Sequence, residues 1–75
     1  MAVYERLYQL SQREYDVLDL LAEGMTNPQI ANALSIAERT AEHHVASILG
    51  KLEVSNRTQA AVRALQRGIV RNQRR

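Results

Sequence analysis

The chain has 75 residues and a formal net charge of +2, with 45% hydrophobic residues and no cysteine. A chain this short forms one small domain, because it cannot divide into two separately buried cores. The lack of cysteine excludes disulfides, thiolate metal sites and thiol nucleophiles, and no apolar stretch is long enough to span a membrane. We therefore expect a soluble cytoplasmic protein that is too small for a multi-layer enzyme cavity.

The charge is unevenly distributed along the chain. Residues 1–37 contain two arginines and five carboxylates, whereas residues 38–75 contain eight lysines and arginines and three carboxylates. A basic half opposite an acidic half suggests a polyanionic partner, most plausibly nucleic acid. A solvated face followed by a basic tail explains the same charges equally well, so charge alone leaves both interpretations open.

Helix signals dominate the chain, and no stretch shows the two-residue alternation of a strand, so we expect an all-α fold. Ser11 and Glu14 have capping-box spacing, which predicts a first helix over about residues 12–23, with Gly24 just past its end. Tyr15 is expected to pack at the edge of the buried side of this helix. The apolar residues that should face the core are Val17, Leu18, Leu20 and Leu21.

A second, short helix is predicted over about residues 28–34. Asn27 is a suitable N-cap, and Pro28 at the first helical position loses no needed donor. The side expected to be buried contains Ile30, Ala31 and Leu34. A tight turn over residues 35–37 would join this helix to the next, and two helices joined so closely form a helix-turn-helix unit.

The third helix, predicted over about residues 38–52, has the clearest amphipathic pattern. Its apolar side contains Ala41, Val45, Ile48, Leu49 and Leu52. The opposite side is small and polar, which suits a helix whose backbone comes close to another surface, and it contains Arg39, His43, Ala46, Ser47 and Gly50. Gly50 either marks such an approach or is simply tolerated there.

The fourth helix is predicted over about residues 57–67, after a start signal at Ser55 or Asn56, and Gly68 should end it. Asn56 and Gln59 have a weaker capping-box spacing. We expect residues 1–9 to be an N-terminal arm or a linker remnant, residues 10–70 to form the domain, and residues 71–75 to form a basic tail.

Two runs of residues resemble a known family. The first contains Leu10-Ser11-x-Arg13-Glu14-x-x-Val17-Leu18, Gly24-Met25-Thr26-Asn27 and Ile30-Ala31-x-x-Leu34. The second contains Arg39-Thr40-x-x-x-His44-Val45-x-x-Ile48-x-x-Lys51-Leu52-x-Val54-x-x-Arg57-x-x-Ala60. Their types and spacing are similar to those of the LuxR-type (NarL/GerE-like) helix-turn-helix domain over residues 10–70.

This resemblance implies a four-helix bundle that binds duplex DNA sequence-specifically and regulates transcription, commonly as the output module of a bacterial response regulator. It implies that the third helix enters the major groove, that the start of the second helix faces phosphate, and that the fourth helix forms a homodimer contact. RNA polymerase is a further candidate partner. Three positions depart from the family pattern: Glu42 stands where a lysine is common, Pro28 where a lysine or glutamine is common, and Ala37 where a serine or threonine commonly caps the helix.

The candidate site residues follow from these assignments. Base-reading candidates are Glu42, His43 and Ala46, and Glu42 is suited to accept a hydrogen bond from a cytosine amino group. Phosphate-contact candidates are Thr26, Asn27, Thr40, His44, Ser47, Lys51 and Arg57. Dimerisation candidates are Ala61, Val62, Leu65 and Ile69, because the fourth helix has more apolar surface than one face of a monomer needs. Simple solvent exposure, local capping and packing by the N-terminal arm are the competing explanations.

No catalytic site, cofactor site, metal site or small-molecule substrate is expected. His43 and His44 are adjacent, so their side chains point about 100° apart, whereas two metal ligands on one helix need a spacing of three or four residues. The serines lack a suitable base, and no glycine-rich loop is present. The alternative function is a helical protein-interaction module without direct DNA binding, and a salt-sensitive shift of a duplex would separate the two.

Overall fold

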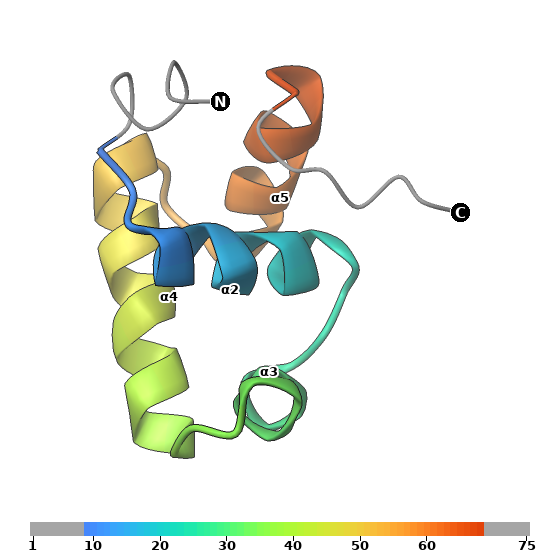
Figure 1. Cartoon of the computed structure of the whole chain (residues 1–75). Helices are drawn as coiled ribbons and strands as arrows, with labels where there is room; N and C mark the ends of the chain where they lie inside the picture. The colour runs from blue at the N-terminus through green and yellow to red at the C-terminus, as the bar shows by residue number, and fades with distance from the viewer. Residues whose placement is uncertain (1–8, 69–75) are drawn as a thin grey trace.

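The computed structural model describes residues 9–68, which form four α-helices and their connections (Figure 1). The helices are α2 (Gln12–Ala22), α3 (Asn27–Leu34), α4 (Glu38–Leu52) and α5 (Arg57–Gln66). The described part of the chain contains no strand, so the predicted all-α class is confirmed. None of these helices is long and apolar enough to cross a bilayer.

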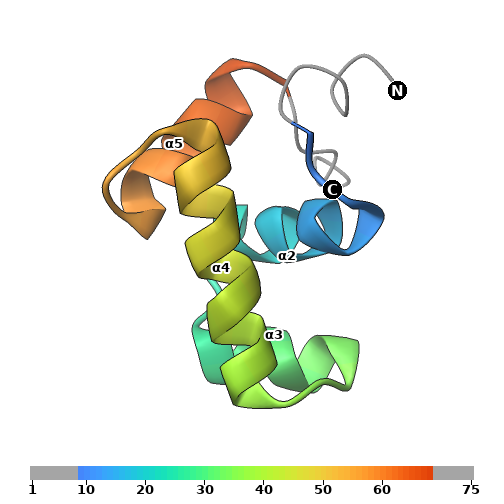
Figure 2. The ribbon, with the colours of Figure 1, turned by 90° about the vertical axis from the view of Figure 1, so that its left-hand side faces the viewer.

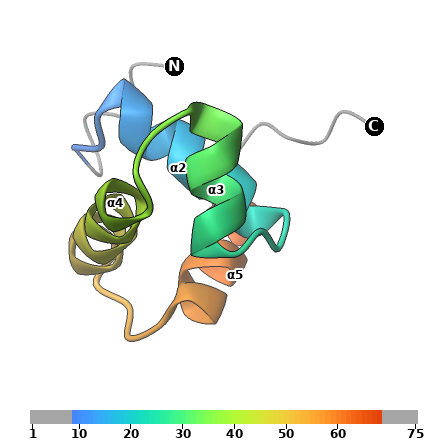
Figure 3. The same ribbon diagram turned by 90° about the horizontal axis from the view of Figure 1, so that it is seen from below.

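The longest helix, α4, organises the bundle. It packs against α2, α3 and α5, while α5 packs against α2 and α4. Figure 2 shows α4 running along one side of the molecule, with α2 and α3 behind it and α5 beside its C-terminal half. Viewed from below in Figure 3, the start of α3 lies near the start of α5. One long face of α4 is therefore left uncovered by the other helices.

The core is built from the apolar sides that the sequence pattern predicts. Its fully buried side chains include Leu18, Ile30, Ile48 and Leu52, which come from α2, α3 and α4. Leu20, Leu34 and Leu49, predicted on the same sides, are only partly buried. Tyr15 is buried rather than at the edge of the core.

The two N-terminal caps illustrate one correct and one wrong prediction. The Ser11–Glu14 capping box of α2 is confirmed, with Glu14 N donating to Ser11 Oγ at 3.1 Å and Ser11 N donating to a Glu14 carboxylate oxygen at 2.9 Å. The prediction that Asn27 caps α3 is wrong. Thr26 is the N-cap and forms a capping box with Gln29, so α3 begins at Asn27 and not at Pro28.

The remaining helix ends agree with the predictions to within one residue. Helix α2 ends at Ala22 with Glu23 as its C-cap, and α5 ends at Gln66 with Arg67 as its C-cap. Asn56 caps α5 by accepting from Gln59 N at 2.9 Å, but the Gln59 side chain turns back to Ser55 N instead of Asn56 N. The Asn56 box is therefore only half formed.

The turn between α3 and α4 is short and well defined. Ser35 ends α3 in the left-handed region, with φ of 58°, and Ile36 N donates to the Ala31 carbonyl at 3.0 Å. Ala37 is the N-cap of α4, and it forms no side-chain cap because its methyl group cannot accept a hydrogen bond. Such a missing cap costs about 1 kcal/mol, so packing against α3, which lies beside the start of α4, must stabilise this end instead.

Candidate nucleic-acid interface

The outer face of α4 is polar and exposed. The three base-reading candidates, Glu42, His43 and Ala46, are all exposed, as is Thr40 near the start of the helix. His43 and Ala46 lie opposite the buried seam, which contains Ala41, Val45, Ile48 and Leu52, and Thr40 and Glu42 lie at the edges of the outer face. Gly50 is also exposed, and apart from its chain neighbours and the backbone of α4, no atom of the described residues lies within 4 Å of the place that a Cβ would take there, so no contact with another described element requires a glycine. This face is free to approach another molecule.

A buried carboxylate holds α4 against α2. The Glu14 side chain is only 8% exposed and lies 2.8 Å from the Lys51 ammonium, while Ser47 donates to its other oxygen at 2.7 Å. Burial alone would raise the pKa of Glu14, but the hydrogen bonds from Lys51, Ser47 and the Ser11 amide, together with the Lys51 charge, outweigh it and lower the pKa to about 2. The carboxylate is therefore ionised, and it fixes the C-terminal half of α4 on the start of α2.

Two phosphate-contact candidates belong to this cluster. Lys51 Nζ donates to Glu14 and also to the Gln9 carbonyl at 3.0 Å, and its side chain is 37% exposed. An ammonium has three N–H donors, and within residues 9–68 two of them have acceptors. Ser47 is half-buried and donates its hydroxyl hydrogen to Glu14. His44, the third candidate on this side of α4, is half-buried.

A second polar cluster forms at the start of α3. Thr26 is exposed and caps the helix, whereas Asn27 is half-buried. The Arg57 guanidinium donates to Asn27 Oδ1 at 2.7 Å and to the Met25 carbonyl at 2.6 Å. The structure thus brings Asn27 and Arg57 together, while Thr40 and Lys51 lie toward opposite ends of α4.

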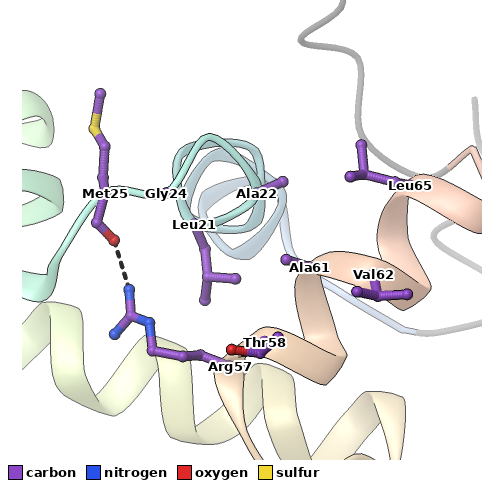
Figure 4. Close-up of a pocket in the computed structure, with 9 residues that line it drawn as sticks. All are labelled: Leu21, Ala22, Gly24, Met25, Arg57, Thr58, Ala61, Val62 and Leu65. Atoms are coloured by element: carbon purple, nitrogen blue, oxygen red, sulfur yellow. Dashed lines mark hydrogen bonds between the residues drawn. The ribbon is translucent and has the colours of Figure 1, made fainter.

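The outer side of α5 is apolar. Val62 and Leu65 are 47% and 51% exposed, and they are the exposed large hydrophobic residues of the described chain. Ala61 is partly buried against the core, and Ile69 lies outside the described residues. A hollow of about 330 Å³ lies between α5 and the end of α2 (Figure 4), lined by Leu21, Ala22, Gly24, Met25, Arg57, Thr58, Ala61, Val62 and Leu65.

One residue that positions the site was missed in the sequence. Glu14 was assigned only a local capping role, although it also orders Ser47 and Lys51 on α4. A serine and a lysine four residues apart lie on the same side of a helix and can donate to one carboxylate. The sequence does not show which carboxylate of another helix faces that side. Among residues 9–68, no group of histidine and acidic side chains is arranged to hold a metal ion.

The comparisons with known proteins identify the family. Residues 8–64 match the family model described as "Bacterial regulatory proteins, luxR family". The chain is 52% identical over 62 residues to the uncharacterized transcriptional regulatory protein YhcZ of Bacillus subtilis. The aligned region covers 83% of this chain and 29% of YhcZ. It is 43% identical over 65 residues to the transcriptional regulatory protein DegU of Brevibacillus brevis, covering 87% of this chain and 28% of DegU.

A third relative has a more specific name. The chain is 44% identical over 61 residues to the response regulator protein VraR of Staphylococcus aureus, covering 81% of this chain and 29% of VraR. The chain thus spans less than a third of the length of these curated relatives. The family match covers most of the chain and coincides with the four helices described above. The chain therefore belongs to the luxR family of bacterial regulatory proteins, as a helix-turn-helix DNA-binding domain of transcription regulation.

Proposed function

We propose that the chain binds a specific duplex DNA site as a homodimer, with α4 as the recognition helix in the major groove. The observation that carries this proposal is the exposed, polar outer face of α4 beside a fully buried seam. A helix of this kind fits the major groove, where base edges present distinct patterns of donors and acceptors. His43 and Ala46 lie on that face and Glu42 lies at its edge, and these three exposed residues are the proposed base-reading residues.

Backbone contacts are proposed on both sides of the recognition helix. Thr26 and Thr40 are exposed, at the starts of α3 and α4, and can donate hydroxyl hydrogens to phosphate. Asn27, His44, Ser47, Lys51 and Arg57 are proposed as further contacts. Among the described residues, two of the three N–H donors of the Lys51 ammonium and two of the five N–H donors of the Arg57 guanidinium have partners.

The homodimer is proposed to form through α5. Val62 and Leu65 expose apolar surface on the same helix, and Ala61 and Ile69 are the further contact residues proposed. A two-fold dimer pairs the same patch on both protomers, so one apolar helix face is sufficient for self-association. Two recognition helices would then read an inverted repeat.

The chain is also proposed to be the output domain of a response regulator. This step rests on the similarity to the response regulator protein VraR, with which the chain has 44% identity over 61 residues. The chain matches less than a third of VraR, which leaves room in such a protein for a signal-receiving part. RNA polymerase is proposed as a further protein contact of the DNA-bound domain.

Selection of bound sequences from a random duplex pool, followed by binding measurements across a salt series, tests the proposal. We expect an inverted repeat and a linear fall of log K with log salt, because bound lysines and arginines release counterions from phosphates. Failure to bind any duplex at low salt would contradict the proposal. That result would favour the helical protein-interaction module instead.

A further inference from the structure

Arg57 connects two parts of the molecule that have different proposed roles. It is the first residue of α5, the proposed dimer helix, and it is half-buried. One end of its guanidinium donates to Asn27 Oδ1, on the first residue of α3, and the other to the Met25 carbonyl, in the α2–α3 connection. Figure 4 shows the guanidinium reaching from α5 toward Met25. These bonds tie α5 to the beginning of the helix-turn-helix unit.

Apolar packing is incomplete next to this link. The hollow of about 330 Å³ between α5 and the end of α2 is lined by Met25 and Arg57 themselves, beside Leu21 and Val62. The buried side of α5 packs closely on α2 and α4 through Ala60 and Ala64, whereas the side of α5 that faces Met25 lacks such close apolar contacts at the hollow. Hydrogen bonds from a rigid, planar guanidinium are therefore well suited to fix the angle between α5 and α3.

We propose that Arg57 is a positioning residue that sets which spacing of DNA half-sites the protein binds. This inference rests on the proposed function, in which α5 forms the dimer and α4 reads DNA. In such a dimer the angle between α5 and the helix-turn-helix unit determines the separation of the two recognition helices. Arg57 thus acts through the relative orientation of α3 and α5. Asn27 takes part in the same positioning, because its Oδ1 is one of the two acceptors of the Arg57 guanidinium.

The experiment measures binding to a set of inverted repeats whose half-sites differ in spacing by single base pairs around about 10 bp. The proteins are the wild type, Asn27→Ala and Arg57→Lys. Both variants keep the net charge, but the first loses the acceptor and the second loses the planar fork that reaches two acceptors. We expect the ratio between the best and the next spacing to fall by about 3- to 30-fold in each variant.

Controls separate positioning from two simpler roles. Lost stability, or a lost phosphate contact, lowers binding at every spacing by the same factor and leaves the ratio unchanged. A variant with both substitutions should change the ratio no more than Arg57→Lys alone, because the two residues act through one link. Each protein is measured at a temperature at which circular dichroism shows that it is folded.

Each result has a definite meaning. An unchanged spacing ratio in both variants would overturn the role of Arg57. A decrease of about one unit per half-site in the salt slope of an Arg57→Gln variant, with the ratio unchanged, would leave Arg57 with only the phosphate contact of the proposed function and would overturn its positioning role. The wild-type measurement tests the proposed function separately, because binding without any spacing preference would overturn the α5 homodimer itself.

Discussion

Glu14 combines a local and a long-range role in one side chain. One carboxylate oxygen accepts from the Ser11 amide in the capping box and from Lys51, and the other accepts from Ser47. A buried charge is tolerated only when hydrogen bonds and an opposite charge compensate for its lost hydration. Both are present here, since Ser11, Ser47 and Lys51 donate hydrogen bonds and Lys51 carries the opposite charge, so the start of α2 and the C-terminal half of α4 are stabilised as one unit.

The pKa of Glu14 makes the stability depend on acid pH. The folded-state pKa of about 2 lies below the ordinary value of 4.5, so the folded state binds a proton less readily than the unfolded chain. The stabilisation is complete above about pH 4.5 and is lost as the pH falls toward 2. We expect the difference in unfolding free energy between the wild type and Glu14→Gln to be largest near pH 7 and to shrink below pH 4.

Denaturant unfolding at a series of pH values measures this difference. Glu42→Gln is the matched control, because it removes one carboxylate from an exposed position of α4. The expected loss at neutral pH is about 1 to 3 kcal/mol for Glu14→Gln and within about 0.5 kcal/mol for the control. A difference that stays constant from pH 7 to pH 2 would contradict the ionised cluster.

Glu42 provides a test of how α4 faces DNA. It is exposed at the edge of the proposed base-reading face, and a carboxylate close to duplex DNA is repelled by phosphates. Glu42→Lys should therefore raise the affinity for unrelated DNA and steepen the salt dependence of log K by up to about one unit per new phosphate contact. If Glu42 accepts from a cytosine, the same change also relaxes selection at one base pair per half-site by about 1 to 3 kcal/mol.

Binding across a salt series, with each base pair of the half-site varied in turn, measures both effects. Glu53→Lys makes the same charge change beyond the end of α4, where Glu53 is exposed as the C-cap, and serves as the control. An affinity gain with unchanged base preference would show that Glu42 faces the backbone and not a base. No change in either quantity would mean that this part of α4 points away from DNA.

At the scale of elements, the helices were predictable where the signal is local. The bounds of α4 agree with the predicted residues 38–52, because its apolar residues recur with the helical period over four turns. The start of α3 could not be predicted in this way, because Thr26 and Asn27 are both good N-caps and Pro28 is acceptable at the first or second helical position. The Thr26–Gln29 pair is the signal that decides, because it closes a full capping box.

The site was less predictable than the helices, for a physical reason. Exposure of Glu42, His43 and Ala46 follows from the period of α4 alone. The hydrogen-bond partners of Lys51 and Arg57 do not follow from the helical period, because these partners lie 30 to 42 positions away in the sequence. Such contacts depend on the crossing angles of helices, which are set by the packing of the whole core.

The buried seam of α4 can be tested by truncation. Ile48 is fully buried, and Val45 is nearly so, between the helices that α4 contacts. Ile48→Ala should reduce the unfolding free energy by about 2 to 4 kcal/mol, and Val45→Ala by about 1 to 3 kcal/mol, because each leaves a cavity. His43→Ala on the outer face is the control and should change it by less than about 0.5 kcal/mol.

Thermal and denaturant unfolding, both followed by circular dichroism, measure these changes. His43→Ala should weaken DNA binding without altering stability, whereas the seam variants should do the reverse when they are measured under folding conditions. Near-neutral effects of both seam substitutions would show that the buried and exposed sides of α4 are exchanged.

At the scale of the whole molecule, the two proposed surfaces lie on different helices. The outer face of α4 is polar, while the outer side of α5 exposes Val62 and Leu65. Both helices pack against α2 and against each other, so α2 is a shared support. A dimer through α5 therefore leaves α4 of each protomer open to DNA, and dimerisation and DNA binding should be coupled without sharing residues.

Leu65→Arg tests this coupling directly. It places a charge in the exposed apolar patch, where burying it in an interface without a partner is costly, so self-association should fall. Binding to an inverted repeat with half-sites about 10 bp apart should fall with it, by about tenfold or more, while binding to a single half-site is retained. The added positive charge on its own would favour DNA, so a loss of binding cannot come from the charge.

Sedimentation equilibrium and binding to full and half-sites measure the two effects together. Gln66→Arg is the matched control, because it adds the same charge at the adjacent exposed position of α5. The control should bind the inverted repeat at least as well as the wild type. If the Leu65→Arg protein binds the inverted repeat like the wild type, α5 is excluded as the dimer interface. A disrupted interface could not hold two recognition helices at the separation that the inverted repeat requires.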